Sequence, residues 1–147
     1  SWYHTLKMKD VYTDGSCLGN PGNGGWAAIS DSFRICGGEI ESTNNRMEMQ
    51  AVIHGLKKCL EMGLLEICIY TDSSYVKNGI TKWTKQWEIN GWKTASGLAV
   101  KNIDLWKKMI KLSKKFLILD WKWVKAHNGN PMNEAVDTLA RKVAGCL

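Results

Sequence analysis

The stretch KDVYTDGSCLGNPGNGG, residues 9–25, decides how the rest of the sequence is interpreted. Its apolar beginning predicts a strand over Lys9–Thr13 that carries Asp14 at its end. The glycines and asparagines that follow, together with Pro21, predict an irregular loop over Gly15–Gly25. A single aspartate between a strand and a glycine-rich loop is an ordinary turn residue, so its meaning depends on the other acids.

Three more carboxylates occupy comparable positions. Glu48 lies near the start of a helix predicted over Asn44–Leu60, and Asp72 follows an apolar run over Leu64–Tyr70. Asp137 lies in the last amphipathic helix. If these elements pack as one α/β layer, the four acids can converge at one end of a sheet. Clustered carboxylates raise one another's pKa, and hard divalent cations are the usual way to keep them ionised.

Each acid taken singly also has a plain alternative. Asp14 fits a turn, Asp72 fits a helix N-cap, and Glu48 fits a favourable charge in the first turn of a helix. Asp137 stands four residues before Arg141, which fits a surface ion pair. Each of these alternatives is reasonable for one acid considered alone.

The remaining sequence predicts an α/β fold with a five-stranded mixed β-sheet flanked by helices, in one domain over residues 1–147. Residues 1–7 are interpreted either as a native extension or as an added remnant. The further strands are expected over Trp26–Ser30, Phe33–Ile40 and Phe116–Val124. The further helices are expected over Ser73–Thr81, Lys82–Ile89, Asp104–Lys114 and from Met132 to Val143, with irregular chain over Asn90–Val100.

Composition narrows the class of protein. The 147 residues are 44% hydrophobic and 23% charged, as in a soluble globular protein, and no apolar run approaches membrane-spanning length. Five cysteines without a C-x-x-C pair argue against a disulfide scaffold and a structural zinc site, and fit a reducing cytoplasm. Residues 77–115 hold ten lysines and two acids, a net +8, whereas the whole chain is +6. A polyanion held by these lysines is therefore expected.

Seven motifs occur in a recognisable order: YTDGSCLGNPG (12–22), TNNRME (43–48), TDSSY (71–75), GITKW (79–83), GWKT (91–94), VKNIDLW (100–106) and WVKAH (123–127). Together they resemble type 1 ribonuclease H, the bacterial single-domain form that cuts RNA in RNA/DNA hybrids. The resemblance runs from about Val11 to about Ala144 and implies the ribonuclease H-like fold. It also implies that the four acids bind two Mg²⁺ ions, with Mn²⁺ as a substitute.

The resemblance implies that His127 helps proton transfer or product release. A histidine titrates in the useful range and stands here in a loop rich in Gly and Asn. The plain alternative is a loop histidine satisfied by water. Ala126 stands where the family usually has glycine, which suggests a stiffer loop.

Contacts to the hybrid are also implied by the resemblance. The RNA strand, recognised by its 2′-hydroxyls, would meet short polar groups and backbone amides: Gly15, Ser16, Cys17, Asn20, Asn44, Asn45 and Ser74. Thr43 and Asn102 match a phosphate pocket for the DNA strand, and Thr43 or Asn44 also fits a helix N-cap. A basic protrusion would grip the DNA strand through Lys82, Trp83, Lys85, Trp87, Trp92 and Lys93, although one or two of the tryptophans are expected in the core. Glu41, Ser74 and Glu88 depart from the family pattern, and Glu88 is expected to repel the DNA strand.

The leading hypothesis is an Mg²⁺-dependent endoribonuclease for RNA/DNA hybrids that leaves 5′-phosphate and 3′-hydroxyl ends. It is expected to be a cytoplasmic monomer with no membrane partner. One alternative keeps the fold and changes the substrate to double-stranded RNA. Another is a non-catalytic nucleic-acid-binding module, against which the four acids argue, because binding alone gains nothing from negative charge beside phosphate.

Overall fold

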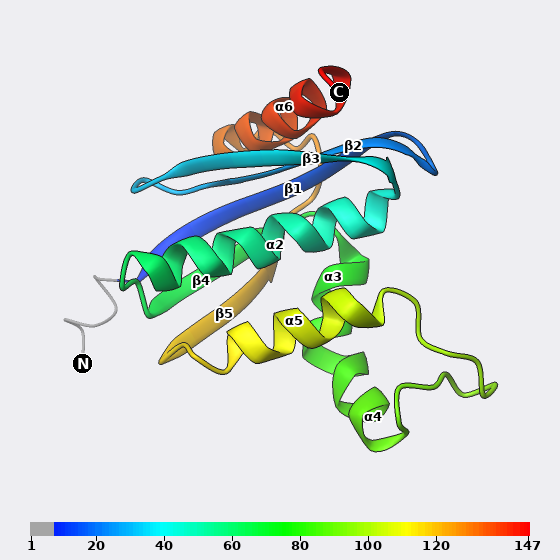
Figure 1. Ribbon diagram of the computed structural model, residues 1–147. Coiled ribbons are helices and arrows are strands. Elements are labelled where there is room, and N and C mark those ends of the chain that lie inside the picture. The colour runs from blue at the N-terminus through cyan, green and yellow to red at the C-terminus, as the bar shows by residue number, and fades with distance from the viewer. Residues whose placement is uncertain (1–7) are drawn as a thin grey trace.

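The computed structural model describes residues 8–147 and contains a five-stranded mixed sheet (Figure 1). The strands are β1 (Lys9–Gly19), β2 (Gly22–Ile29), β3 (Arg34–Ser42), β4 (Glu66–Thr71) and β5 (Ile118–Trp123), in the spatial order β3-β2-β1-β4-β5. The first three strands are antiparallel neighbours, and β4 and β5 run parallel to β1. The predicted sheet is thus confirmed, while the expectation about residues 1–7 lies outside the described residues.

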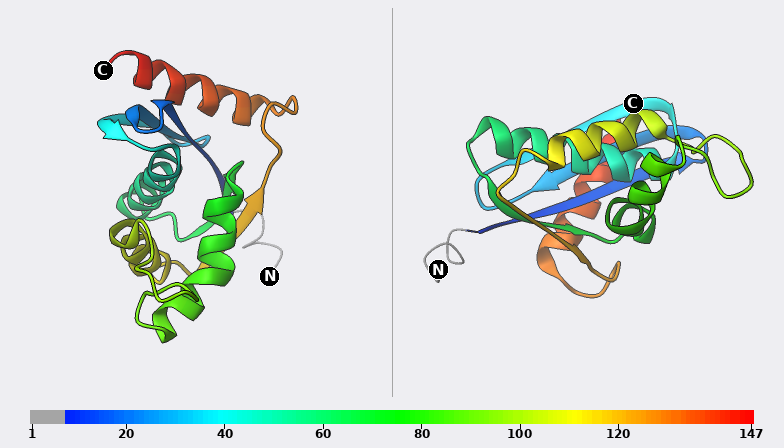
Figure 2. Two further views of the ribbon diagram at one scale, coloured as in Figure 1. Left: turned by 90° about the vertical axis from the view of Figure 1, so that its right-hand side faces the viewer. Right: turned by 90° about the horizontal axis from the view of Figure 1, so that it is seen from below.

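Helices cover both faces of the sheet (Figure 2). They are α2 (Asn44–Glu61), α3 (Ser74–Asn78), the π-helical turn η1 (Gly79–Trp83), α4 (Thr84–Ile89), α5 (Ile103–Ser113) and α6 (Pro131–Gly145). Helix α2 packs on β1 and β2 with α5 beside it, whereas α6 packs on the opposite face against β1, β2 and β3. The succession α3–η1–α4 leads away from the end of β4 (Figure 1).

The main core lies between α2 and the sheet. Met49, Val52, Ile53 and Leu56 of α2, which repeat at helical spacing, are buried, and Leu60 in the last turn is half-buried. They meet apolar residues of the central strands and of α5 in one cluster, which includes Val11, Ala28, Met49, Val52, Ile53, Leu56, Ile67, Ile69, Leu105 and Trp106. This packing fixes the start of α2 against β1, which is where two of the four acids lie.

The predicted loop over Gly15–Gly25 is wrong. Strands β1 and β2 continue through it as an antiparallel pair and turn only at Asn20-Pro21. A side chain at Gly15 would collide with the backbone of α2, and one at Gly25 would collide with the backbone of α6. The glycines therefore allow close helix packing on both faces of the sheet, a use that sequence alone does not separate from a flexible loop.

The two short helices predicted over Ser73–Thr81 and Lys82–Ile89 form one helical succession with a π turn at its centre. Gly79 begins this turn and lies against the fully buried Trp106, whose ring occupies the space that a side chain would need. The local widening of the helix therefore coincides with a close contact to α5.

Candidate active site

Asp14, Glu48 and Asp72 come together at the edge where the ladder between β1 and β4 ends. One carboxylate oxygen of each lies within 4.8 Å of the others. Asp14 and Glu48 are only 2% and 5% exposed. The last register pair of β1 and β4 joins Tyr12 to Tyr70, so Asp14 projects beyond β4 from the middle of β1. The expectation that Asp14 ends its strand is therefore wrong, although Asp72 does directly follow β4.

The backbone around the acids holds them in place. The amide of Gly15 donates hydrogen bonds to Asp14 Oδ1, at 2.9 Å, and to Glu48 Oε1. The indole of Trp123 on β5 donates to the backbone carbonyl of Asp72 at 3.0 Å. The N-cap of α3 is Ser73, so the plain alternative for Asp72, a helix N-cap, is wrong.

Burial and mutual repulsion make the cluster electrostatically unfavourable by itself. Desolvation, assisted by the charges of Asp72 and Asp137, raises the pKa of Asp14 to about 8, against a lowering contribution from its hydrogen bond with Glu48. Desolvation followed by the charge of Asp14 raises the pKa of Glu48 well above its ordinary value. Asp14 Oδ2 is buried without a hydrogen-bond partner among residues 8–147. A divalent cation with oxygen ligands would satisfy both the charge and the unpaired oxygen.

Asp137 lies at the border of this cluster, in the second turn of α6. Its carboxylate forms an ion pair with Arg141 at 2.8 Å, as the plain alternative proposed. The pair is not an ordinary surface pair, however, because the Asp137 side chain is only 14% exposed and its charge acts on Asp14. Asp137 is therefore able to serve the acid cluster, which we define as Asp14, Glu48, Asp72 and Asp137.

Comparison with known proteins identifies the family. The family model described as RNase H matches residues 7–145. The chain belongs to the ribonuclease H family. Curated relatives include a ribonuclease H of Anaplasma marginale, 50% identical over 89% of this chain and 86% of the relative, and a ribonuclease HI of Xylella fastidiosa, 49% identical over 92% and 91%. The crystal structure of LC9-RNase H1, a type 1 RNase H with the type 2 active-site motif, superposes with a TM-score of 0.83 at 30% identity, over 95% of this chain and 72% of that one.

Several residues predicted to touch RNA also have structural contacts in this ribonuclease H. Asn20 Oδ1 accepts a hydrogen bond from the amide of Asn44 at 3.2 Å, which ties the β1–β2 turn to the start of α2. The Cys17 thiol donates to the carbonyl oxygens of Gly22 and Ser42, at 3.2 and 3.4 Å. These contacts hold the motif at residues 12–22 beside the start of α2, where the motif at residues 43–48 lies.

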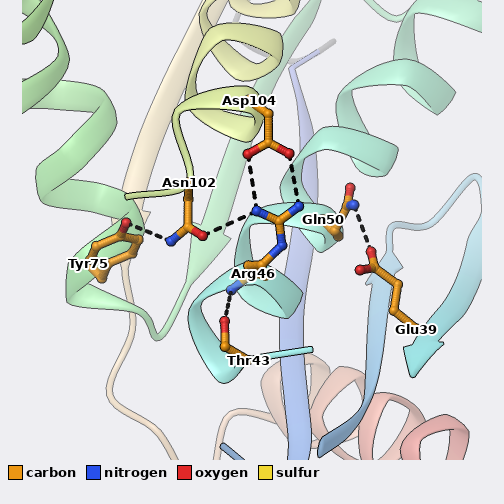
Figure 3. A network of polar contacts seen from close by, with 7 residues as sticks. All are labelled: Glu39, Thr43, Arg46, Gln50, Tyr75, Asn102 and Asp104. Atoms are coloured by element: carbon orange, nitrogen blue, oxygen red, sulfur yellow. Dashed lines mark hydrogen bonds and ion pairs between the residues drawn. The ribbon is translucent and has the colours of Figure 1, made fainter. Parts of the chain in front are cut away.

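Thr43 and Asn102, the predicted phosphate pocket, belong to a network of hydrogen bonds that the sequence did not predict (Figure 3). Thr43 is the N-cap of α2, because its hydroxyl oxygen accepts a hydrogen bond from the Arg46 amide at 3.2 Å. Of the two N-caps predicted from sequence, Thr43 and Asn44, the structure has the first. The Arg46 guanidinium donates to Asn102 at 3.2 Å and to both oxygens of Asp104, at 3.1 and 2.9 Å. Asn102 in turn donates to the Tyr75 hydroxyl at 3.1 Å. Arg46, Tyr75 and Asp104 were present in the quoted motifs. Arg46 meets Asp104 across 58 residues and Tyr75 meets Asn102 across 27, so these pairs needed the structure.

The tryptophans of the protrusion divide between surface and core. Trp87 and Trp92 pack against the main core, and Trp87 contacts the buried Trp106 with ring centroids 5.7 Å apart. Trp83 is 37% exposed, with its ring 5.9 Å from that of Trp87. The expectation that one or two of the three are core residues is confirmed, which leaves Trp83 as the most accessible ring for a ligand.

The lysines of the protrusion also divide. Lys82 on η1 and Lys93 in the loop after α4 are exposed. Lys85 is also exposed and lines, together with Glu88, a hollow between α4 and α5. Glu88 also lines the adjoining hollow beside Lys107. The two charged residues of α4, Lys85 and Glu88, thus both border α5.

His127 lies exposed in the loop between β5 and α6 and has a left-handed backbone, with φ of 54°. Within residues 8–147 no hydrogen bond or ion pair joins it to the acid cluster. The predicted loop is confirmed. The catalytic role of His127 stays a prediction.

Proposed function

We propose that this ribonuclease H hydrolyses the RNA strand of RNA/DNA hybrids with two Mg²⁺ ions held by the acid cluster, leaving 5′-phosphate and 3′-hydroxyl ends. Mn²⁺ is the expected substitute, since both ions accept carboxylate and water ligands. The observation that carries the proposal is the meeting of three carboxylates from β1, α2 and the end of β4 within 4.8 Å. Family membership and the curated relatives named ribonuclease H support the activity.

The chain's own residues prepare this site for cations. Buried Asp14 and Glu48 lack water to stabilise their charges, so a cation binds them more strongly than it would bind exposed carboxylates. The Gly15 amide orients Glu48 toward Asp14. Bound there, the ions would supply Lewis acidity that lowers the pKa of an attacking water and stabilises the departing 3′ oxygen. Asp137 would join the set by exchanging its pairing with Arg141 for a cation.

His127 receives the role of a proton carrier or a product-release residue in this proposal. Its exposed position in a loop that directly precedes α6, the helix of Asp137, lets it approach from solvent. Histidine is the residue type that most often transfers protons in general acid–base catalysis. Ala126 gives the loop less freedom than glycine would.

Recognition of the hybrid is divided between the two strands. Near the acid cluster, Ser16 is half-buried and Asn45 and Ser74 are exposed, so they can hydrogen-bond 2′-hydroxyls of the RNA. Thr43 and Asn102 would bind a phosphate of the DNA strand, with the remaining grip provided by exposed Lys82, Trp83 and Lys93.

The wider assignments follow the same reasoning. We propose a monomeric protein with one domain over residues 1–147. Five free cysteines fit a reducing cytoplasm. Within residues 8–147, no helix combines the length and apolar composition that crossing a bilayer requires.

A duplex panel tests the proposal. End-labelled RNA/DNA, RNA/RNA and DNA/DNA duplexes of one sequence are incubated with the protein and Mg²⁺, and the product ends are analysed. Cleavage of the RNA strand of the hybrid alone, with 5′-phosphate products that ligase accepts, is expected. Equal cleavage of RNA/RNA would replace the substrate assignment, and binding without cleavage of any duplex would replace the enzyme with a binding module.

A further inference from the structure

The underside of the molecule carries a basic groove that shares no residue with the acid cluster. Helix α5 and the nearby α4 appear together when the molecule is seen from below (Figure 2, right). Between them lies a hollow of about 350 Å³ lined by Glu88, Trp92, Lys107, Ile110, Lys111 and Lys114. A second hollow of about 290 Å³ adjoins it, because Glu88, Ile110 and Lys114 line both. We call the two hollows the α4–α5 groove.

The lysines of the groove are free to take an anion. Lys107, Lys111 and Lys114 are exposed, and none of them forms an ion pair with any carboxylate of residues 8–147. Their spacing along α5, four and then three residues, places them on one face of the helix at intervals of about 5 to 6 Å. That interval is close to the separation of successive phosphates along an extended strand.

The walls of the groove also offer aromatic surface. Trp92 and Trp121 line its two halves and are half-buried, which leaves part of each indole accessible. The Lys107 ammonium lies 5.5 Å from the centre of the Trp92 ring. A positive groove interleaved with aromatic side chains is the arrangement that binds single-stranded nucleic acid, because phosphates meet the cations while bases stack on the rings.

We propose that the α4–α5 groove is a binding site for single-stranded nucleic acid, apart from the acid cluster and from exposed Lys82, Trp83 and Lys93, and that Lys85 and Trp92, expected by resemblance to touch the hybrid, serve this groove instead. A single strand can lay unpaired bases against the half-buried indoles of Trp92 and Trp121, whereas the bases of a duplex are already stacked on one another. Glu88 weakens the site, since it is the carboxylate among the lining residues and has no cation partner within 4 Å among residues 8–147.

The test uses two variants that remove the same charge from the same segment. Lys107→Gln/Lys114→Gln changes the groove, and Lys108→Gln/Lys115→Gln changes two exposed lysines outside the lining set. Fluorescence anisotropy measures binding of labelled single-stranded oligothymidine by the full chain, in EDTA so that no cleavage occurs. The groove variant should bind about tenfold more weakly, with a salt slope smaller by about 1.4 for two lost phosphate contacts. The control variant should lose less than half as much binding free energy for the single strand as the groove variant does.

Three further measurements complete the test. Glu88→Gln should tighten binding of the single strand. The groove variant should keep the wild-type kcat on a short blunt hybrid in Mg²⁺, which separates this site from the proposed nuclease site, and should keep the wild-type melting temperature. If the two double variants lose the same affinity for the single strand, the overall positive charge of the segment explains binding and the proposal is overturned.

Two other outcomes overturn it in favour of other ligands. A larger loss for duplex DNA than for the single strand would identify a duplex contact. The groove variant could instead lose its affinity for polyglutamate while it binds the single strand as well as the wild type does. That result would identify the groove as a surface for an acidic protein.

Discussion

The acid cluster and the basic segment over residues 77–115 are built in opposite ways. The acids come from β1, the end of β4, α2 and α6, all of which are anchored by the sheet, and two of the acids are almost fully buried. The lysines come from short helices, an irregular loop and the outer face of α5, where most are exposed. The difference shows that positions requiring fixed geometry lie on packed elements, whereas contacts to a polyanion need only charge near a surface.

The energetic character of the two regions differs for the same reason. Repulsion and desolvation make the acid cluster unfavourable without a cation, as the raised pKa values of Asp14 and Glu48 show. The exposed lysines are screened by water and salt, so each contributes little to stability. Substitutions should therefore have large effects on catalysis in the first region and graded effects on affinity in the second.

The largest effect is expected for Asp14→Asn. Removing one ligand charge should lower kcat for hybrid cleavage by about 10³-fold while hybrid binding persists through the lysines. Single-turnover cleavage and a binding assay in Ca²⁺ measure the two quantities separately. Asp120→Asn, an exposed acid on β5, is the matched control and should retain normal turnover. Near-normal cleavage by Asp14→Asn in Mg²⁺ would contradict the metal assignment.

A smaller catalytic loss is expected for His127→Ala. Loss of a proton carrier should lower kcat by about 10²-fold with little change in KM. Asn128→Ala, in the same loop, controls for changes in loop conformation. If kcat is unchanged, or if KM rises instead, His127 has no part in proton transfer and the loop only positions substrate.

Stability without metal should depend on pH through the acid cluster. Asp14 has a pKa near 8 when folded and an ordinary acidic pKa when unfolded, so the folded protein holds more protons between these values. Its stability therefore falls as pH rises across that interval. In EDTA, the melting temperature should be lower at about pH 8 than at about pH 5.5, and Mg²⁺ should reduce the difference because it binds the ionised carboxylates.

Asp14→Asn should flatten that pH profile, since it removes one of the titrating groups. A wild-type melting temperature that rises steadily from the acidic to the alkaline condition in EDTA would show that the buried acids do not dominate the pH dependence.

The smallest effects are expected on KM for the hybrid, from substitutions of Lys82 and Glu88 in the basic segment. Lys82→Gln should raise KM for the hybrid about threefold, because one phosphate contact is lost and the salt slope falls by about 0.9. Glu88→Gln should change that KM by less than the Lys82 variant does, because Glu88 faces α5 rather than Lys82 and Lys93. A lower KM with a steeper salt slope for Glu88→Gln would restore the expectation, drawn from sequence, that Glu88 repels the DNA strand.

Local patterns in the sequence determined the order and type of most elements. The apolar spacing of α2 predicted its buried face, and the apolar run before Asp72 predicted β4. The motifs also predicted the family, and they contained three of the acids that the structure brings together. The predicted loop after Asp14 failed because glycine is used both for turns and for close packing, and only the neighbouring helices distinguish these uses.

Only the tertiary structure decided which distant residues meet. It joined Arg46 to Asp104 and Asn102, placed the amide of Gly15 on Glu48, and turned Glu88 toward α5. The sequence determined the chemical groups and their secondary structure, since both depend on neighbours along the chain. The tertiary structure determined distances, burial and pKa values, because these depend on packing between segments that the chain brings together only when it folds.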